Sequence, residues 1–378
     1  MQYEQITFAD INTVVRLATF APAGSTVEAV AVVDIATPGE PFPSQCADIA
    51  EACSRLLSRL SHMRPAMARV FLSDPANQIP LLRLPSGFPL SVVGQAPLRG
   101  TKISLLLYLT SAATPLPLDP PLSGHTRNGY SHIWLTGATV PAADDSLTAT
   151  RTLLTAYADS LGRLGLTIPD ACVRTWFFVR DIDRNYSGVV AGRNSVFSSI
   201  GLTPQTHFIA STGIGATPPD GALLQLDAYA VGGLSPRQVS YLYAAACMNR
   251  TSEYGVAFER GTTIDYADRR HLLISGTASI DSRGTILHPG DILAQTARMV
   301  GNVNALLAEG GATMADVTAM IIYLRDPADY AAVRAWFDDR FPATPRLIVH
   351  APVCRPGWLI EMECRAVIPA ANPDFRPF

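Results

Sequence analysis

The chain has 378 residues and a formal net charge of −3 at pH 7, so it carries no basic surplus of the kind that binds nucleic acid. No apolar run approaches the roughly 18 to 20 residues of a membrane helix, which excludes a membrane-spanning protein of the helical type. Only one of the 29 basic residues is a lysine, Lys102, and no glycine-rich loop precedes it. A P-loop and a lysine Schiff base are therefore disfavoured.

The first residues contain no basic segment followed by an apolar one, so no secretory signal is expected. The six cysteines form no CxxC pair and no dense disulfide pattern, and the seven histidines form no ligand cluster. These features predict a cytoplasmic protein that uses neither a metal nor another cofactor.

Along the chain, the first predicted elements are a strand at 27–35, an amphipathic helix at 46–62 and a strand at 67–75. A closing strand follows within residues 89–110. The Pro-rich stretch at 114–129 is then expected to be a linker.

The same order of elements returns twice, with sequences that resemble each other. The second copy has a strand at 131–140, a helix at 147–166, a strand at 173–182 and a closing segment at 215–231. After an expected connection at 230–255, the third copy has corresponding segments at 270–281, 292–312, 317–327 and 351–367. We therefore expect three α/β (α+β) units at 1–115, 130–230 and 255–378, each a sheet with helices on one face.

Three such units in one chain can close into an intramolecular pseudo-trimer, which predicts a monomer with internal pseudo-threefold symmetry. In each closing strand, the fourth residue after a glycine turn lies on an equivalent face because side chains alternate along a strand. These residues are Ser104, Gln225 and Glu361, so only the third copy has an acid there. One working cleft is expected.

The third copy carries the segments LLISGTASID, NVNALLAEGGATMADV, IIYLRDPADYAAV and TPRLIVHAPVCRPGWLIEMECRAV. In these it resembles the Rid (YjgF-type) deaminase family, whose members are homotrimers with clefts between subunits. The resemblance implies Rid-like (chorismate-mutase-like) units. It also implies roles for Arg346 and Glu361, which correspond to an Arg and a Glu that the family uses.

A longer motif, RTWFFVRDIDRNYSGVVAGRNSVFSSIGLTPQTHFIASTGI, precedes GTTIDYADRRHLLISGTASID and the segment from Cys354 to Glu361. With these segments the chain resembles the chorismatase family of secondary metabolism. The resemblance implies a hydrolase acting on the enolpyruvyl ether of chorismate. Such an enzyme releases pyruvate with 3-hydroxybenzoate, 4-hydroxybenzoate or a dihydroxycyclohexadiene carboxylate.

Glu361 is the candidate acid. Protonation of the enol-ether methylene needs a carboxyl that keeps its proton near neutral pH, and apolar surroundings provide this. Glu361 lies in WLIEMEC between apolar residues, and it matches the acid of the chorismatase family. The alternative is a carboxylate that faces solvent or pairs with an arginine.

Cys354, seven residues earlier, is a candidate base or nucleophile if its pKa is lowered. The resemblance links a Cys at this place to aromatised product, whereas Ala267 matches the members that stop at the dihydrodiol. The chain mixes the two patterns, so the product stays open. An inert packing role for the thiol is the alternative.

Five residues are candidates for binding substrate: Tyr186, Arg193, Arg346, Tyr266 and Ala267. Tyr186 and Arg193 are seven residues apart, two helical turns, and so lie on one helix face. By resemblance they bind substrate, as does Arg346, and two arginines from the second and third copies would hold the two carboxylates of chorismate. Tyr266 is a weaker candidate for the pocket wall, with packing as the alternative.

Two other functions remain open. One is a Rid-type imine or enamine deaminase, favoured by Arg346 and Glu361. The other is a non-enzymatic scaffold that binds a small molecule in the cleft between copies, which the loss of the acid in two copies would fit.

Overall fold

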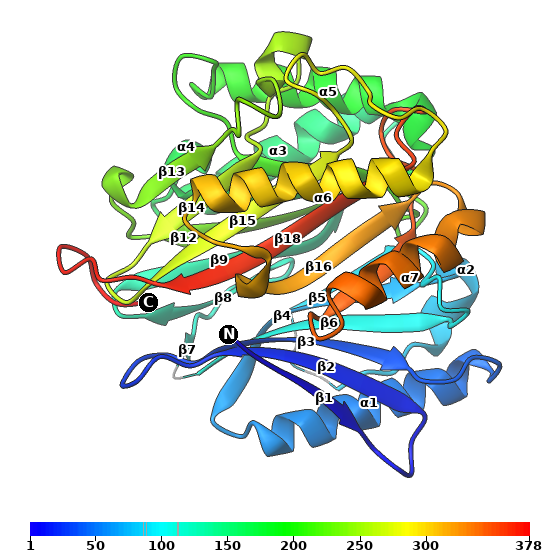
Figure 1. Cartoon of the computed structure of the whole chain (residues 1–378). Helices are drawn as coiled ribbons and strands as arrows, with labels where there is room; N and C mark the ends of the chain where they lie inside the picture. The colour runs from blue at the N-terminus through cyan, green and yellow to red at the C-terminus, as the bar shows by residue number, and fades with distance from the viewer. Residues whose placement is uncertain (86, 88, 112) are drawn as a thin grey trace.

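The computed structural model describes residues 1–85, 87, 89–111 and 113–378, and it contains three six-stranded mixed sheets that lie around a common centre (Figure 1). The first sheet has the order β1-β2-β3-β6-β4-β5, in which only β4 and β5 pair in parallel. The elements of this first unit are β1 (Gln2–Thr7), β2 (Thr13–Phe20), β3 (Glu28–Ile35), α1 (Phe42–Arg59), β4 (Met63–Leu72), α2 (Pro75–Gln78), the 3-10 turn η1 (Ile79–Leu81), β5 (Leu90–Gly94) and β6 (Ile103–Ser111).

The helix α1 shows why the sequence folds this way. Its residues Cys46, Ile49, Cys53 and Leu56 recur at intervals of three and four, and all of them are buried against the sheet. The predicted helix is confirmed, and it covers one face of the first sheet.

The second unit repeats this arrangement. It comprises β7 (Thr114–Pro115), β8 (Leu122–Arg127), β9 (Tyr130–Thr139), α3 (Ser146–Gly162), α4 (Ile168–Ala171), β10 (Cys172–Val179), α5 (Ile182–Ser199), β11 (Ala210–Gly215) and β12 (Leu224–Gly232). The stretch expected to be a linker at 114–129 therefore includes two strands. The reason is that β8 pairs along its length with β9. The prolines of the stretch lie outside β8 and do not interrupt this pairing.

The third unit begins within the expected connection at 230–255, because β13 lies there and pairs with β14. Its elements are η2 (Pro236–Gln238), β13 (Val239–Leu242), η3 (Thr251–Tyr254), β14 (Gly261–Asp265), β15 (Arg269–Ala278), α6 (Ile292–Glu309), η4 (Met314–Asp316), β16 (Val317–Leu324), η5 (Pro327–Asp329), α7 (Tyr330–Arg340), β17 (Arg346–His350) and β18 (Ile360–Pro369).

All three sheets have the same strand order, with β3, β9 and β15 equivalent and β6, β12 and β18 equivalent. This confirms the predicted α+β fold of three tandem units arranged as an intramolecular pseudo-trimer. Each unit buries its own helices against its own sheet. A fourth apolar cluster draws side chains from all three units, including Val30, Trp134 and Leu273.

Three of the ion pairs between units form a ring around this shared centre. Arg69 of the first unit contacts Asp227 of the second at 2.8 Å, and Arg174 of the second contacts Glu363 of the third at 2.7 Å. The ring closes where Arg365 of the third unit contacts Glu28 of the first at 2.6 Å. In the first pair both side chains are only 1% exposed, so neither charge can rely on water.

Among the described residues, every helix is too short or too polar to span a membrane.

The buried ion pair of Arg69 and Asp227 predicts a large loss of stability when one partner is substituted. Asp227→Asn leaves the Arg69 guanidinium buried without a counter-charge, so we expect the free energy of unfolding to fall by about 3 to 5 kcal/mol. Urea denaturation followed by circular dichroism measures this. Asp10→Asn is the matched control, because Asp10 pairs with Arg55 at the surface, and it should change stability little. Equal effects of the two substitutions would contradict a structural role for the buried pair.

Candidate active site

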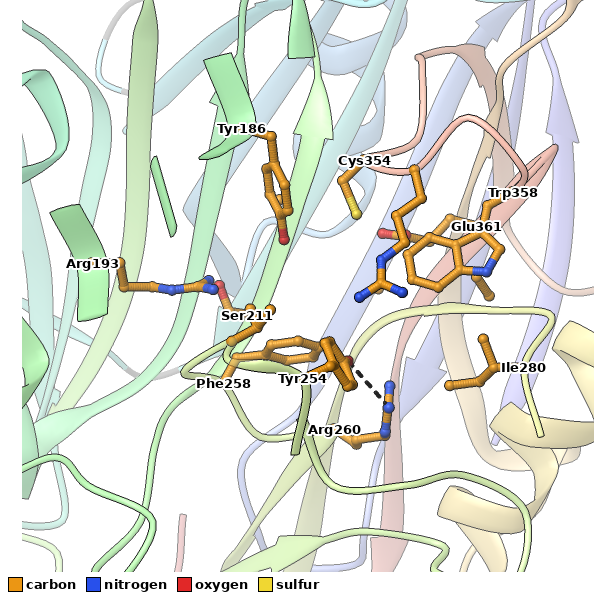
Figure 2. Close-up of a pocket in the computed structure, with 15 residues that line it drawn as sticks. Tyr186, Arg193, Ser211, Tyr254, Phe258, Arg260, Ile280, Cys354, Trp358 and Glu361 are labelled. Carbon is orange, nitrogen blue, oxygen red and sulfur yellow. Dashed lines mark hydrogen bonds between the residues drawn. The ribbon is translucent and has the colours of Figure 1, made fainter. Parts of the chain in front are cut away.

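A pocket lies between the second and third units (Figure 2). The second unit contributes α5 and β11 to its walls, and the third unit contributes β15, the start of β18 and the segments before β14 and β18. Four of the predicted residues line this pocket together: Tyr186, Arg193, Cys354 and Glu361. Both walls come from one chain.

The helix α5 carries Tyr186 and Arg193 on one face, as their spacing predicts. Arg193 is only 1% exposed, and its guanidinium lies over the rings of Phe177 at 5.6 Å and Phe258 at 5.9 Å. Its Nε and Nη2 atoms have no hydrogen-bond partner among the described residues. Burial lowers the pKa of Arg193 but leaves a cation that lacks a carboxylate, which is the arrangement of an anion site.

Two further arginines line the same pocket, and sequence reasoning missed both. Arg260 is 4% exposed and donates to the carbonyl of Asn249 at 2.9 Å and to the hydroxyl of Tyr254 at 3.2 Å. Arg355 stacks on Tyr254 and on Trp358 at 4.8 and 4.9 Å. Within the described part of the chain, neither forms an ion pair. No local pattern distinguishes these two from the other arginines, because each lies in an irregular segment before a strand, where neither helical spacing nor strand alternation applies.

Glu361 is the second residue of β18 and the one carboxyl among the described residues that line the pocket. It is 5% exposed, and burial together with the nearby charge of Glu363 raises its pKa to about 8. Arg174 and Arg260 oppose this shift without cancelling it. The carboxyl therefore holds its proton at neutral pH and can act as an acid.

Gly276 on β15 makes room for this carboxyl. A Cβ atom at position 276 would overlap Oε1 of Glu361, so any larger residue would have to displace the acid. The neighbouring pocket residue on the same strand, Ala278, lies directly across from Glu361 in the register of β15 and β18. Two small residues thus shape the wall beside the acid.

Cys354 lies in the turn between β17 and β18 and contacts the hydroxyl of Tyr186. Burial, and next the carboxyl of Glu361, raise the pKa of the thiol to about 12. The condition for a base or nucleophile, a lowered pKa, is not met. The side chain is a neutral thiol that faces the pocket.

Three predicted residues lie elsewhere, and their expected placement is corrected here. Arg346 lines a separate crevice, where its guanidinium binds Asp338 and the carbonyl of Phe341. Tyr266 is fully buried in the cluster at the centre of the three units, next to Tyr130. Ala267 pairs through its backbone with residues near the end of the chain and is not part of the pocket wall.

The equivalent positions in the other two units contain no acid, as predicted. Ser104 donates to Asp34 at 2.6 Å, and Gln225 donates to Ser91 at 3.1 Å. Both are buried in hydrogen-bonded pairs between strands or units. The combination of an acid with unpaired arginines therefore belongs to the cleft of the second and third units.

Comparisons with known proteins give a sequence match to the third unit and a structural match to most of the chain. A family model described as Endoribonuclease L-PSP matches residues 264–368. The 3-aminoacrylate deaminase RutC of Acinetobacter baylyi (strain ATCC 33305 / BD413 / ADP1) is 33% identical over 91 residues, which are 24% of this chain and 72% of RutC. The chain belongs to the endoribonuclease L-PSP (Rid) family.

The similarity to this Rid relative lies in one segment of the chain, whereas a structural match covers most of it. The crystal structure of a chorismatase matches 80% of this chain and 92% of its own, with a TM-score of 0.64 and 21% sequence identity. This shows that the two proteins share the fold. The Rid protein YyfA from Yersinia pestis matches 34% of this chain and 99% of its own, with a TM-score of 0.30 and 21% identity.

The raised pKa of Glu361 can be tested without a substrate. In protein labelled with ¹³C at glutamate carboxyl groups, one signal should titrate near pH 8 and should be absent in Glu361→Gln. Glu363→Gln removes a neighbouring negative charge and should move this midpoint to lower pH, because the ionised form of Glu361 then meets less repulsion. Glu51→Gln, on the exposed face of α1, should leave it unchanged. An ordinary glutamate midpoint in the wild type would contradict the assignment.

Proposed function

We propose that the protein hydrolyses the enolpyruvyl ether of chorismate and releases pyruvate. The observation that carries this proposal is a pocket with three guanidinium groups that lack carboxylate partners in the described chain and one carboxyl that is neutral at pH 7. Chorismate is a small dianion that needs one proton donor, so its charges and its chemistry complement this site. The chorismatase fold supports the same assignment.

The three arginines approach from different walls. Arg193 belongs to α5 of the second unit, whereas Arg260 and Arg355 belong to segments of the third. We assign one substrate carboxylate to Arg193 with Tyr186 and the other to Arg260 and Arg355. Guanidinium groups suit this role because their planar geometry matches a carboxylate and their charge persists after burial.

In the proposed reaction, Glu361 transfers its proton to the terminal methylene carbon of the enolpyruvyl group. This gives an oxocarbenium ion, and Glu361 becomes a carboxylate. Water then adds to the cationic carbon, and the resulting hemiketal breaks its bond to the ring oxygen to give pyruvate and a ring diol. The proton released by the water returns to Glu361, so the acid is regenerated.

The pocket must open for this reaction. Its free volume is about 40 Å³, well below the roughly 150 Å³ of a cavity that binds benzene. Among the described residues, the side chain of Arg355 is held by ring stacking on Tyr254 and Trp358 without an ion pair, so its turn is a suitable entrance. Closure after binding would then exclude bulk water from the cation.

The ring product depends on what happens next to the diol. Loss of water from the dihydroxycyclohexadiene carboxylate gives a hydroxybenzoate, with 3-hydroxybenzoate the expected isomer and 4-hydroxybenzoate the other. We propose that the neutral thiol of Cys354 contacts the ring and favours the aromatic product. Its high pKa supports a role in hydrogen bonding or shape, not as a thiolate.

An imine or enamine deaminase is the second candidate, and the identity with RutC favours it. The two functions share an acidic glutamate but differ in the charge of the substrate, since a deaminase substrate with one carboxylate would leave at least one of the three arginines without an anion. A scaffold that binds the same dianion without reaction would not need the raised pKa of Glu361. An assay of pyruvate release from chorismate distinguishes the proposed hydrolase from both alternatives.

We expect purified protein incubated with chorismate to release pyruvate, measured by coupling to lactate dehydrogenase. Glu361→Gln should lower kcat by about 10² to 10⁴, because the general acid is lost. Glu51→Gln is the matched control at an exposed site. Ammonia release from 3-aminoacrylate, with no pyruvate from chorismate, would support the deaminase and overturn the proposal.

The same assay has a defined pH dependence. The acid must be protonated in the free enzyme, so kcat/KM should be constant below a pKa of about 8 and should decline at higher pH. Glu363→Gln should shift this decline to lower pH, as in the carboxyl titration. A rate that rises through this range would exclude Glu361 as the acid.

Substrate anchoring is tested by a pair of arginine substitutions. Arg193→Met should lower kcat/KM by about 10- to 100-fold, since a charge-assisted hydrogen bond is lost. Arg346→Met should lower it little, because that side chain already pairs with Asp338 in another crevice. A larger effect at Arg346 would restore the role that the resemblance implied.

Cys354→Ala should shift the ring products toward the dihydroxycyclohexadiene carboxylate, resolved by chromatography, while pyruvate release continues. The reason is that the substitution removes the thiol from the ring side of the pocket but keeps the acid. Cys247→Ala, at a half-buried cysteine outside the pocket, is the matched control. An unchanged product ratio would remove Cys354 from the mechanism.

A further inference from the structure

A second cavity lies at the centre of the three units, apart from the candidate active site. Its volume is about 90 Å³, larger than the free space in the pocket around Glu361. Its walls include three equivalent positions, Val30 on β3, Trp134 on β9 and Leu273 on β15. Their cross-strand partners are also equivalent and also line it, so the cavity follows the pseudo-threefold axis.

The walls are mainly aromatic and aliphatic. The ring of Trp134 stacks on Tyr229 with centroids 4.1 Å apart and an angle of 18°, and Tyr108 is tilted against it at 6.0 Å. Trp176 lies between two guanidinium groups, those of Arg69 at 4.7 Å and Arg174 at 4.6 Å. Flat surfaces of this kind favour a flat ligand.

The charged groups of the wall do not call for a charged ligand. Each of the three arginines there belongs to one of the ion pairs that link the units, so every cation has its carboxylate. A bound anion would compete with these carboxylates in a buried setting. The ligand expected in this cavity is therefore neutral.

One polar group in the wall lacks a partner. The Nε1–H of Trp134 makes no hydrogen bond within the described chain, although the side chain is only 7% exposed. The other unpartnered wall atoms, Nε of Arg69 and of Arg365, are donors too. Since a buried donor is usually satisfied, this points to an acceptor atom that the chain does not provide.

Water alone suits this cavity poorly. The space exceeds the roughly 10 to 15 Å³ that one water molecule needs, but each water also needs two to four polar partners. The oxygen atoms of Glu363, which could accept hydrogen bonds from water, already accept them from Arg174, Trp176 and Thr212. Water in this cavity would thus face hydrogen-bond donors and apolar rings, with few acceptors for its own hydrogen atoms.

We propose that the axial cavity is a binding site for a small, neutral, flat aromatic molecule with one hydrogen-bond acceptor, which receives the Nε1–H of Trp134. A cavity of about 150 Å³ lined by apolar side chains binds benzene, and this one has room for a single ring if its walls relax slightly. The proposal is independent of the reaction at Glu361, because the two cavities have no lining residue in common.

Pyridine and benzene form a matched pair of probes, since both are single flat rings and only pyridine has an acceptor atom. In isothermal titration calorimetry near neutral pH, we expect one pyridine per chain and weaker binding of benzene. Trp134→Phe keeps a flat ring but removes the donor. It should weaken pyridine binding by about three- to tenfold and leave benzene nearly unchanged.

The location is tested by filling the cavity. Ala319→Leu adds bulk to its wall and should weaken binding of both probes by about tenfold or more, whereas Ala332→Leu on the exposed face of α7 should have no effect. If Ala319→Leu fails to fold, crystals of the wild type soaked with pyridine show whether the ring lies against Trp134. No binding in solution, density only at soaking concentration, or ordered waters that pyridine does not displace would each overturn the proposal.

Discussion

A ring of three ion pairs links the three units, and one of its members acts on the chemistry of the candidate site. One member, Glu363, pairs with Arg174 across the boundary of the second and third units. The same carboxylate lies two residues from Glu361, and its charge helps to raise the pKa of that acid. A contact that holds the units together thus also keeps a proton on the catalytic candidate at neutral pH.

Arginine suits this ring for a physical reason. A buried lysine can lose its proton, whereas a guanidinium stays charged, stacks on aromatic rings and presents several donors in one plane. Arg69, Arg174 and Arg365 each combine an ion pair with a ring contact, at 4.7, 4.6 and 4.2 Å from Trp176, Trp176 and Tyr108. The near absence of lysine is thus compatible with a molecule whose centre depends on buried cations.

The parts of the site that sequence could predict are those set by local periodicity. Tyr186 and Arg193 share a face because α5 is a regular helix, and Glu361 faces the cleft because side chains alternate along β18. Arg346 could not be placed in this way. It lies opposite Met320 on β16, whereas Glu361 lies opposite Tyr323, on the other side of that strand.

These pairings separate Arg346 and Glu361 by about 10 Å along the sheet and about 10 Å across it, so they face different clefts. In a homotrimer this separation would not matter, because each cleft receives one residue from each of two identical subunits. Here the units differ. The cleft that holds Glu361 therefore receives its second wall from α5, and Arg193 with Arg260 and Arg355 supplies the cations that Arg346 cannot.

Fusion of the three units into one chain makes this division of roles possible. In a symmetric trimer, a substitution that improves one cleft is repeated in all three clefts. A substitution at the axis likewise occurs three times. In this chain Ser104, Gln225 and Glu361 occupy equivalent positions with different partners, and Val30, Trp134 and Leu273 do the same at the axis. Asymmetry therefore allows one acidic cleft and one aromatic central cavity within a fold whose strand order is the same three times over.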